Sequence, residues 1–188
     1  MTHKFKKEGA VYCNPGTMSK RPELAALIGT ICSEWVYVEA TLLNFFGIMM
    51  KVCPPDTPKE DFPQMHPVAM HIFDKIHTVH ARIEVFKNIV QDVIKDDGFK
   101  KEVLGVLEKT KKTAKSRNEV AHALWGISDK EPDALIMVTI YHKFFVYKEN
   151  DFENIIQKIQ TVGTQLIRVQ GRFCTILQST ERENFLSI

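Results

Sequence analysis

Residues 22–53 read PELAALIGTICSEWVYVEATLLNFFGIMMKVC, and this stretch decides the fold. Its apolar side chains recur at steps of three and four: Leu24, Ile28, Ile31, Trp35, Val38, Leu42, Phe46 and Met49. That spacing places them on one face of an α-helix, which turns once in about 3.6 residues. Pro22 is tolerated in a first helical turn, and Cys53-Pro54-Pro55 ends the pattern. We therefore expect one long helix with a buried apolar face.

The same spacing returns on the C-terminal side of this stretch. Five prolines between residues 54 and 67 predict a connecting loop, and a second helix is expected from about Val68 to Lys95. A third helix is expected from about Phe99 to Leu124. Asn150 and Glu153 resemble a capping box, which opens a fourth helix that continues to Ile176.

Between the third and fourth helices the period changes. The β-branched and aromatic runs at 134–141 and 144–148 predict a small β-hairpin. The expected fold class is all-α, an antiparallel bundle of four long helices with a small hairpin between the third and fourth. Residues 1–20 are polar and basic and predict a flexible tail, so the helical domain is expected to occupy residues 21–188.

Composition narrows the class of protein. The chain has 188 residues, 44% of them hydrophobic, which is typical of one globular domain. Its net charge of +2 is too small to create an electrostatic field over the whole protein that would attract nucleic acid. Four cysteines are too few for a disulfide scaffold and predict reduced thiols: Cys13, Cys32, Cys53 and Cys174. The first residues lack the apolar core of a secretory signal, and no uninterrupted apolar window is long enough to span a membrane. We expect a cytoplasmic protein with no membrane contact.

The third predicted helix carries the most informative motif. Residues 115–126 read KSRNEVAHALWG, with Arg117 and Asn118 followed by His122. The arginine–histidine spacing, near the end of a helix in a helical bundle, resembles the RxxxxH signature of the HEPN superfamily. The resemblance covers roughly residues 22–180 by architecture rather than by identity.

The resemblance implies a homodimer whose two motif helices face each other. It also implies a metal-independent endoribonuclease without a cofactor, which leaves a 2′,3′-cyclic phosphate and a 5′-hydroxyl. By the same resemblance, Arg117, Asn118 and His122 are the catalytic residues. The implied setting is a prokaryotic toxin–antitoxin or antiviral defence system, in which a nucleotidyltransferase-like antitoxin is a candidate regulatory partner.

The residue types suit this chemistry independently of the resemblance. An imidazole with a pKa near about 6.5 can accept or donate the proton of a 2′-hydroxyl, and a guanidinium can bind phosphoryl oxygens with two parallel hydrogen bonds. Five residues along a helix turn through about 140° beyond a full turn, so Arg117 and His122 do not share a face. A site assembled from two chains removes this difficulty.

Other residues around the motif have two interpretations each. Glu39 is either a partner of Arg117 or His122 or a polar residue at the edge of the apolar face. Trp125 is either a packing residue or a base-stacking platform. Four lysines are expected to bind RNA phosphates, or else they only solvate the helix: Lys109, Lys111, Lys112 and Lys115.

Two further classes of function stay open. A catalytically inactive module that binds RNA or protein keeps the fold without the reaction. A metal-dependent enzyme would use four residues that share one face of the second predicted helix: Asp74, His77, His80 and Glu84. Ribonuclease activity that resists EDTA distinguishes the leading hypothesis from both.

Overall fold

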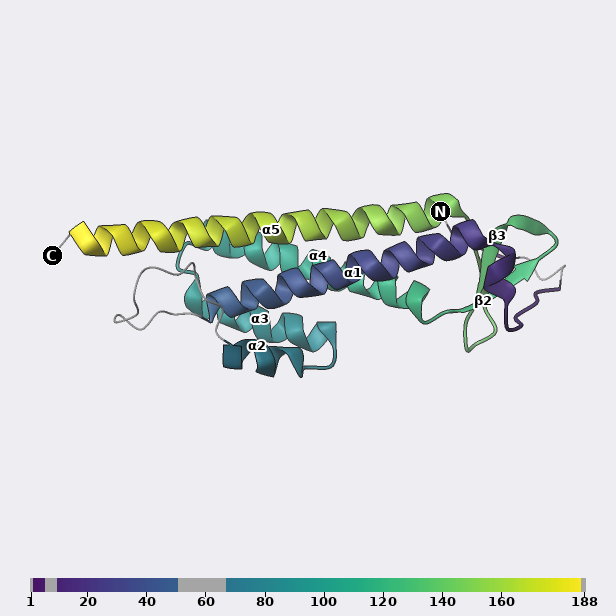
Figure 1. The fold of residues 1–188 in the computed structure, drawn as a ribbon, viewed down its shortest axis with the longest axis horizontal. Helices are drawn as coiled ribbons and strands as arrows, with labels where there is room; N and C mark the ends of the chain where they lie inside the picture. The colour runs from purple at the N-terminus through teal and green to yellow at the C-terminus, as the bar shows by residue number, and fades with distance from the viewer. Residues whose placement is uncertain (1, 6–9, 51–66, 187–188) are drawn as a thin grey trace. The chain divides into compact units, whose positions relative to one another are not determined.

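The computed structural model describes residues 2–5, 10–50 and 67–186 (Figure 1). In these residues the chain forms five α-helices, one short 3-10 helix and a four-stranded antiparallel sheet. The elements in chain order are β1 (His3–Lys4), the 3-10 helix η1 (Thr17–Lys20), α1 (Pro22–Met49), α2 (Pro67–Asp74), α3 (Val79–Val93), α4 (Asp97–Ala121), β2 (Leu124–Ser128), β3 (Glu131–Val138), β4 (Phe144–Tyr147) and α5 (Glu149–Leu186). The expected all-α bundle of four helices and a hairpin is therefore wrong. Cys53 and the proline-rich segment up to residue 66 lie outside the described residues.

The helix expected from Val68 to Lys95 is two helices, α2 and α3. Thr78, in extended conformation, caps α3, and its hydroxyl accepts a hydrogen bond from the backbone N–H of Ala81 at 3.1 Å. Arg82 then turns back and donates hydrogen bonds to the carbonyl oxygens of Ile76 at 2.8 Å and Asp74 at 2.7 Å. The apolar spacing continues through the break, which is why periodicity alone does not reveal it.

The sheet has twice as many strands as the sequence predicts. The expected hairpin is present as β3 and β4, but β2 and the two-residue β1 complete a sheet of order β1-β4-β3-β2. β2 begins at Leu124, which continues the apolar stripe of the preceding helix in sequence. A strand that starts on the last position of a helical pattern is not visible in that pattern.

The chain folds as two compact units, and α1, α4 and α5 each contribute to both. One unit comprises Met1–Val36 and Thr113–Gln160, and the other comprises Tyr37–Lys112 and Thr161–Ile188. We call them the sheet unit and the helical unit.

In the sheet unit both faces of the sheet are covered. On one face, Trp125 packs edge to face on Tyr147 at a centroid distance of 5.2 Å and contacts Phe152 of α5 at 5.5 Å. On the other face, Ala134, Ile136 and Val146 are buried, and they pack against three partly buried side chains: Phe5, Val11 and Phe144. Both faces of this sheet therefore belong to a core.

The N-terminal segment engages both edges of the sheet. β1 pairs with β4, and Tyr12 forms an isolated bridge with Ile127 of β2. These residues belong to the segment that the sequence assigns to a flexible tail. The domain division at residue 20 itself stays a prediction.

In the helical unit, aromatic rings from four helices form the core. Phe46 of α1 stacks on Phe73 of α2 at 4.0 Å, while Phe45 of α1 packs against Phe86 of α3 at 5.1 Å and Phe173 of α5 at 5.9 Å. Two ion pairs link α3 to α4, Lys87 to Glu108 at 2.6 Å and Lys111 to Glu84 at 2.8 Å. Glu102 of α4 pairs with Arg168 and Arg172 of α5.

Among the described helices, α1 is long and apolar enough to cross a membrane by length and composition. A core helix of a globular protein meets the same test, and α1 contributes buried residues to both units, for example Trp35 and Leu42. The cytoplasmic location stays a prediction.

Candidate functional site

The predicted catalytic residues lie at the C-terminal end of α4, in the sheet unit. Asn118 and His122 are exposed and Arg117 is half-buried. The helix stays regular between them, because the backbone N–H of His122 donates to the carbonyl of Asn118 at 3.1 Å. Arg117 and His122 therefore remain about 140° apart around the helix axis. One copy of α4 presents them in different directions.

Arg117 retains hydrogen-bonding capacity. One terminal nitrogen donates to Oδ1 of Asn118 at 3.0 Å, while Nε is buried and has no hydrogen-bond partner among the described residues. A buried donor without an acceptor is costly, and a guanidinium matches the oxygens of a phosphate with two parallel hydrogen bonds. An anion could reach only the exposed end of the guanidinium, where the bond to Asn118 lies, because Nε is closed to solvent.

Trp125 supports the site by packing. It is buried, and its indole N–H donates to the carbonyl of Val120 in the last turn of α4 at 3.2 Å. Together with the contacts to Tyr147 and Phe152, this bond fixes the end of α4 on the sheet. Burial first, and then the charges of Glu119 and Asp151, raise the pKa of the Tyr147 hydroxyl, so this tyrosine stays neutral.

Glu39 lies in the helical unit, where it is half-buried. Its partnership with Arg117 or His122 stays a prediction.

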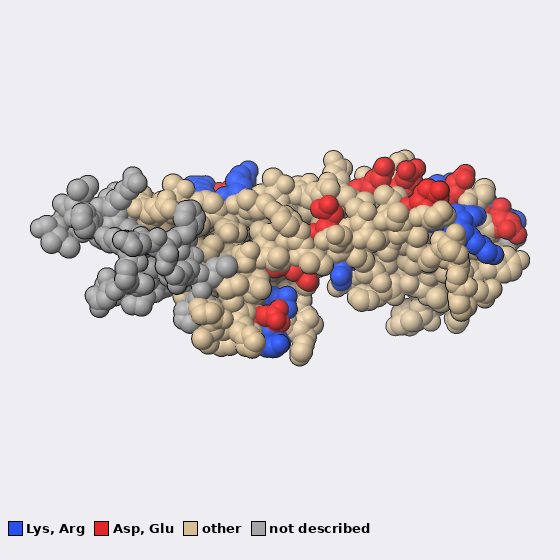
Figure 2. All heavy atoms as spheres, in the orientation of Figure 1, with Lys and Arg blue, Asp and Glu red and all other residues tan. Residues whose placement is uncertain are grey.

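The four predicted RNA-binding lysines are not equivalent. Lys111 is paired with Glu84, and Lys109 lies 3.4 Å from Oε1 of Gln165. Lys112 and Lys115 are exposed and make no ion pair within the described part of the chain. Figure 2 shows basic and acidic side chains interspersed on the face in view, without a broad basic surface. The binding of RNA phosphates by these lysines stays a prediction.

The alternative metal site is not assembled. Asp74 ends α2 and His77 lies in the turn before α3, so the four residues do not share one helix. Asp74 lies 3.6 Å from Arg82, and Glu84 pairs with Lys111 and Lys87. Across residues 2–5, 10–50 and 67–186, no group of three or more His, Cys, Asp or Glu side chains could hold a metal ion.

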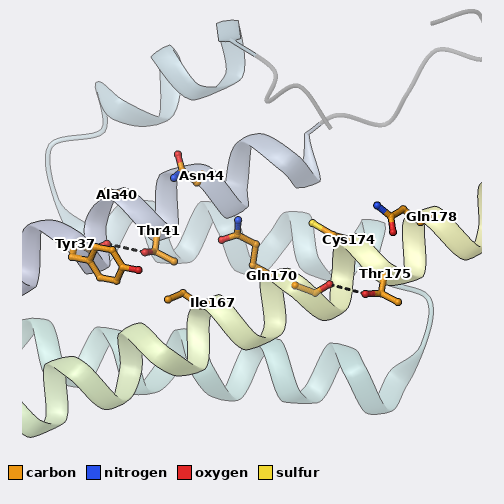
Figure 3. Close-up of a pocket in the computed structure, with 10 residues that line it drawn as sticks. Tyr37, Ala40, Thr41, Asn44, Ile167, Gln170, Cys174, Thr175 and Gln178 are labelled. Carbon is orange, nitrogen blue, oxygen red and sulfur yellow. Dashed lines mark hydrogen bonds between the residues drawn. The ribbon is translucent and has the colours of Figure 1, made fainter. Parts of the chain in front are cut away.

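The helical unit contains a groove that sequence reasoning missed. It has a volume of about 560 Å³ and lies between α1 and α5, and Figure 3 shows its uncharged lining, which includes Tyr37, Asn44, Gln170 and Cys174. Burial raises the pKa of the Cys174 thiol above its usual range, so the thiol is protonated at neutral pH and is a poor nucleophile. The free cysteines are Cys13, Cys32 and Cys174 among the described residues.

Sequence reasoning predicted the turn between β3 and β4 as part of a hairpin but assigned it no function. Leu124 at the start of β2 pairs with Val138, and Val138 pairs with Phe144. The turn therefore lies at the end of the sheet where β2 begins. His122 precedes the first residue of β2 by two positions. The sequence signal for an exposed apolar turn is the pair Ile140-Tyr141. These two large apolar residues are adjacent at the end of a predicted strand, so they break the alternation of apolar and polar residues.

The fold and site define an α+β protein with a polar cluster where a long helix meets a sheet edge. Comparisons with protein-family models, with curated proteins and with solved structures find no match. The HEPN resemblance therefore depends on the motif and its position alone.

Proposed function

We propose that the protein is a metal-independent endoribonuclease of HEPN type that acts as a homodimer. The observation that carries the proposal is the end of α4. There an asparagine accepts a hydrogen bond from the exposed end of the Arg117 guanidinium, and an exposed histidine follows one turn later. RNA cleavage without a metal needs a proton-transfer group and a cation for the phosphoryl oxygens, and these residues supply both.

In the proposed reaction the 2′-hydroxyl oxygen attacks the adjacent phosphorus and the bond from phosphorus to the 5′-oxygen breaks. Either His122 accepts the 2′-hydroxyl proton and water protonates the leaving 5′-oxygen, or water accepts the first proton and protonated His122 donates the second. Arg117 stabilises the charge on the phosphoryl oxygens. Asn118 orients Arg117 through the bond of 3.0 Å. The products are a 2′,3′-cyclic phosphate and a 5′-hydroxyl.

The direction of the side chains supports the proposed dimer. Because a regular α4 separates Arg117 and His122 by about 140°, the arginine of one chain is proposed to act with the histidine of its partner. A regulatory antitoxin remains part of the proposal only through the resemblance.

The first test is cleavage of labelled single-stranded RNA with and without EDTA by wild type and by His122→Ala. We expect EDTA-resistant cleavage by wild type and a loss of about 10²- to 10⁴-fold in His122→Ala, because a positioned proton-transfer group contributes that much to a rate. His122 is exposed, so the melting temperature of the variant should stay within about a degree or two of wild type.

A matched control is His71→Ala, since His71 is an exposed histidine of α2 in the helical unit, away from the turn and from α4. It should cleave at close to the wild-type rate. A folded His122→Ala protein that cleaves RNA as fast as wild type would disprove the proposed reaction, and activity abolished by EDTA would favour a metal-dependent enzyme. RNA binding by wild type without any cleavage would favour the inactive binding module.

A further inference from the structure

The turn between β3 and β4 exposes two large apolar side chains. Ile140 is 86% exposed and Tyr141 is 76% exposed, more than any other large apolar residue in the described part of the chain. His142 and Lys143 follow, both exposed, and residues 139–143 contain no acidic side chain. An exposed aromatic ring next to a lysine is a combination typical of single-stranded nucleic-acid binding.

The backbone of this turn is held in place. Thr139 donates to the carbonyl of Lys143 at 3.0 Å, and His142 donates to the carbonyl of Thr139 at 2.9 Å. The backbone N–H of Lys143 donates to the hydroxyl of Thr139 at 3.1 Å. His142 has a φ of 53°, a left-handed conformation that is uncommon for a residue other than glycine. Tyr141 is therefore presented from a fixed turn, which lowers the entropy cost of binding a partner.

The turn lies at the same end of the sheet as His122. Leu124 and Val138 are directly paired, and His122 and Ile140 each lie two residues beyond that pair. Two residues of extended chain span at most about 7 Å and paired strands are about 5 Å apart, so the Cα atoms of His122 and Ile140 lie within about 20 Å. Leu124, which is 58% exposed, lies between them in this path.

We propose that Tyr141 is a stacking platform for an unpaired base of the RNA and that Lys143 contacts an adjacent phosphate. The inference rests on the proposed function, because it assigns the substrate's single-stranded segment to the same end of the sheet as His122. Unpaired bases stack on aromatic side chains whatever their sequence, and a neighbouring ammonium group adds affinity for the backbone. The turn thus selects single-stranded over double-stranded RNA, whose bases are already stacked.

The test measures binding separately from cleavage, in the His122→Ala background, by fluorescence anisotropy. The probes are a short unstructured RNA oligonucleotide and an abasic oligonucleotide with the same sugar–phosphate backbone. Tyr141→Ala should weaken binding to the RNA by about 5- to 150-fold, the usual cost of one lost base–aromatic stack, and should leave binding to the abasic probe unchanged. Tyr141→Phe should bind like the parent, while Tyr141→Leu should lose affinity because it keeps an apolar side chain without a ring.

Tyr37→Ala is the matched control, since Tyr37 is an exposed tyrosine on α1 in the helical unit. Equal weakening on both probes, or none on either, overturns the stacking role. A Tyr141→Ala protein that becomes monomeric without a change in RNA affinity overturns it in favour of protein docking. Parent protein that binds no RNA overturns both proposals, whereas base-dependent binding without any cleavage by wild type overturns the reaction alone.

Discussion

Gly126 shows how a single residue determines the architecture of the sheet unit. A Cβ atom at this position would lie 2.6 Å from Sγ of Cys13, 2.7 Å from Cγ1 of Val11 and 3.1 Å from the carbonyl oxygen of Tyr12. The last of these is a backbone atom in the segment that bridges to Ile127. The N-terminal segment can approach β2 so closely only because residue 126 has no side chain.

Gly126→Ala should therefore lower the free energy of unfolding by about 1–3 kcal/mol, the usual cost of overpacking. The measurement is urea unfolding followed by tryptophan fluorescence, because Trp35 and Trp125 both belong to the sheet unit. Gly105→Ala is the control, since a Cβ at Gly105 in α4 meets no atom within 4 Å. It should stabilise the helix by about 0.5–1 kcal/mol. A Gly126→Ala midpoint equal to that of wild type would contradict the close approach.

At the scale of elements, periodicity predicts the long helices well. The apolar stripes of α1, α4 and α5 persist over many turns, so the existence of these helices can be read directly from the sequence, although α5 continues to Leu186, beyond the predicted end at Ile176. The break between α2 and α3 could not be predicted in this way, because it depends on the cap of Thr78 and on the long reach of Arg82. β2 was missed because its first residue, Leu124, also fits the preceding helix.

In the candidate site, too, the sequence reveals local spacing but not contacts between distant parts of the chain. The sequence alone identifies Arg117, Asn118 and His122 as a cluster on one helix, because their spacing is local. It does not reveal that the turn at 139–143 lies at the same end of the sheet as His122, since that placement depends on strand pairing between residues that are apart in the chain. It also does not separate Lys111 from Lys112 and Lys115, because the partner of Lys111 is on another helix.

The ion pairs between α3 and α4 predict a stability that depends on pH. Hydrogen bonds from Lys111 and Lys87 lower the pKa values of Glu84 and Glu108, respectively. A carboxyl whose pKa is lower in the folded state stabilises the fold at neutral pH, and this contribution is lost as the pH falls through the folded-state pKa. Thermal unfolding between about pH 7 and about pH 3 should therefore show a falling melting temperature on the acid side.

The double variant Glu84→Gln, Glu108→Gln should have a slightly lower melting temperature than wild type at neutral pH. Its melting temperature should fall less than that of wild type when the pH is lowered. Glu153→Gln, an exposed carboxyl of α5 in the sheet unit, should keep the wild-type pH dependence. If the double variant and wild type show parallel curves, the two ion pairs do not contribute to acid sensitivity.

At the scale of the whole molecule, the proposed site depends on a second copy of the chain. Each chain of 21.6 kDa presents one Arg117 and one His122 in different directions, so two chains related by a two-fold axis would form two equivalent sites. Each site would combine the arginine of one chain with the histidine of the other. A pair of variants can separate these contributions.

The most direct measurement mixes Arg117→Ala with His122→Ala, each inactive alone, under conditions in which chains exchange, and then assays RNA cleavage. With random exchange, half of the dimers are mixed, and one of their two sites holds both wild-type residues, so about a quarter of wild-type activity should return. Light scattering confirms that both variants and the mixture are dimers. Recovery to about that level supports a site shared between chains, whereas exchanged, folded dimers that stay inactive would contradict it.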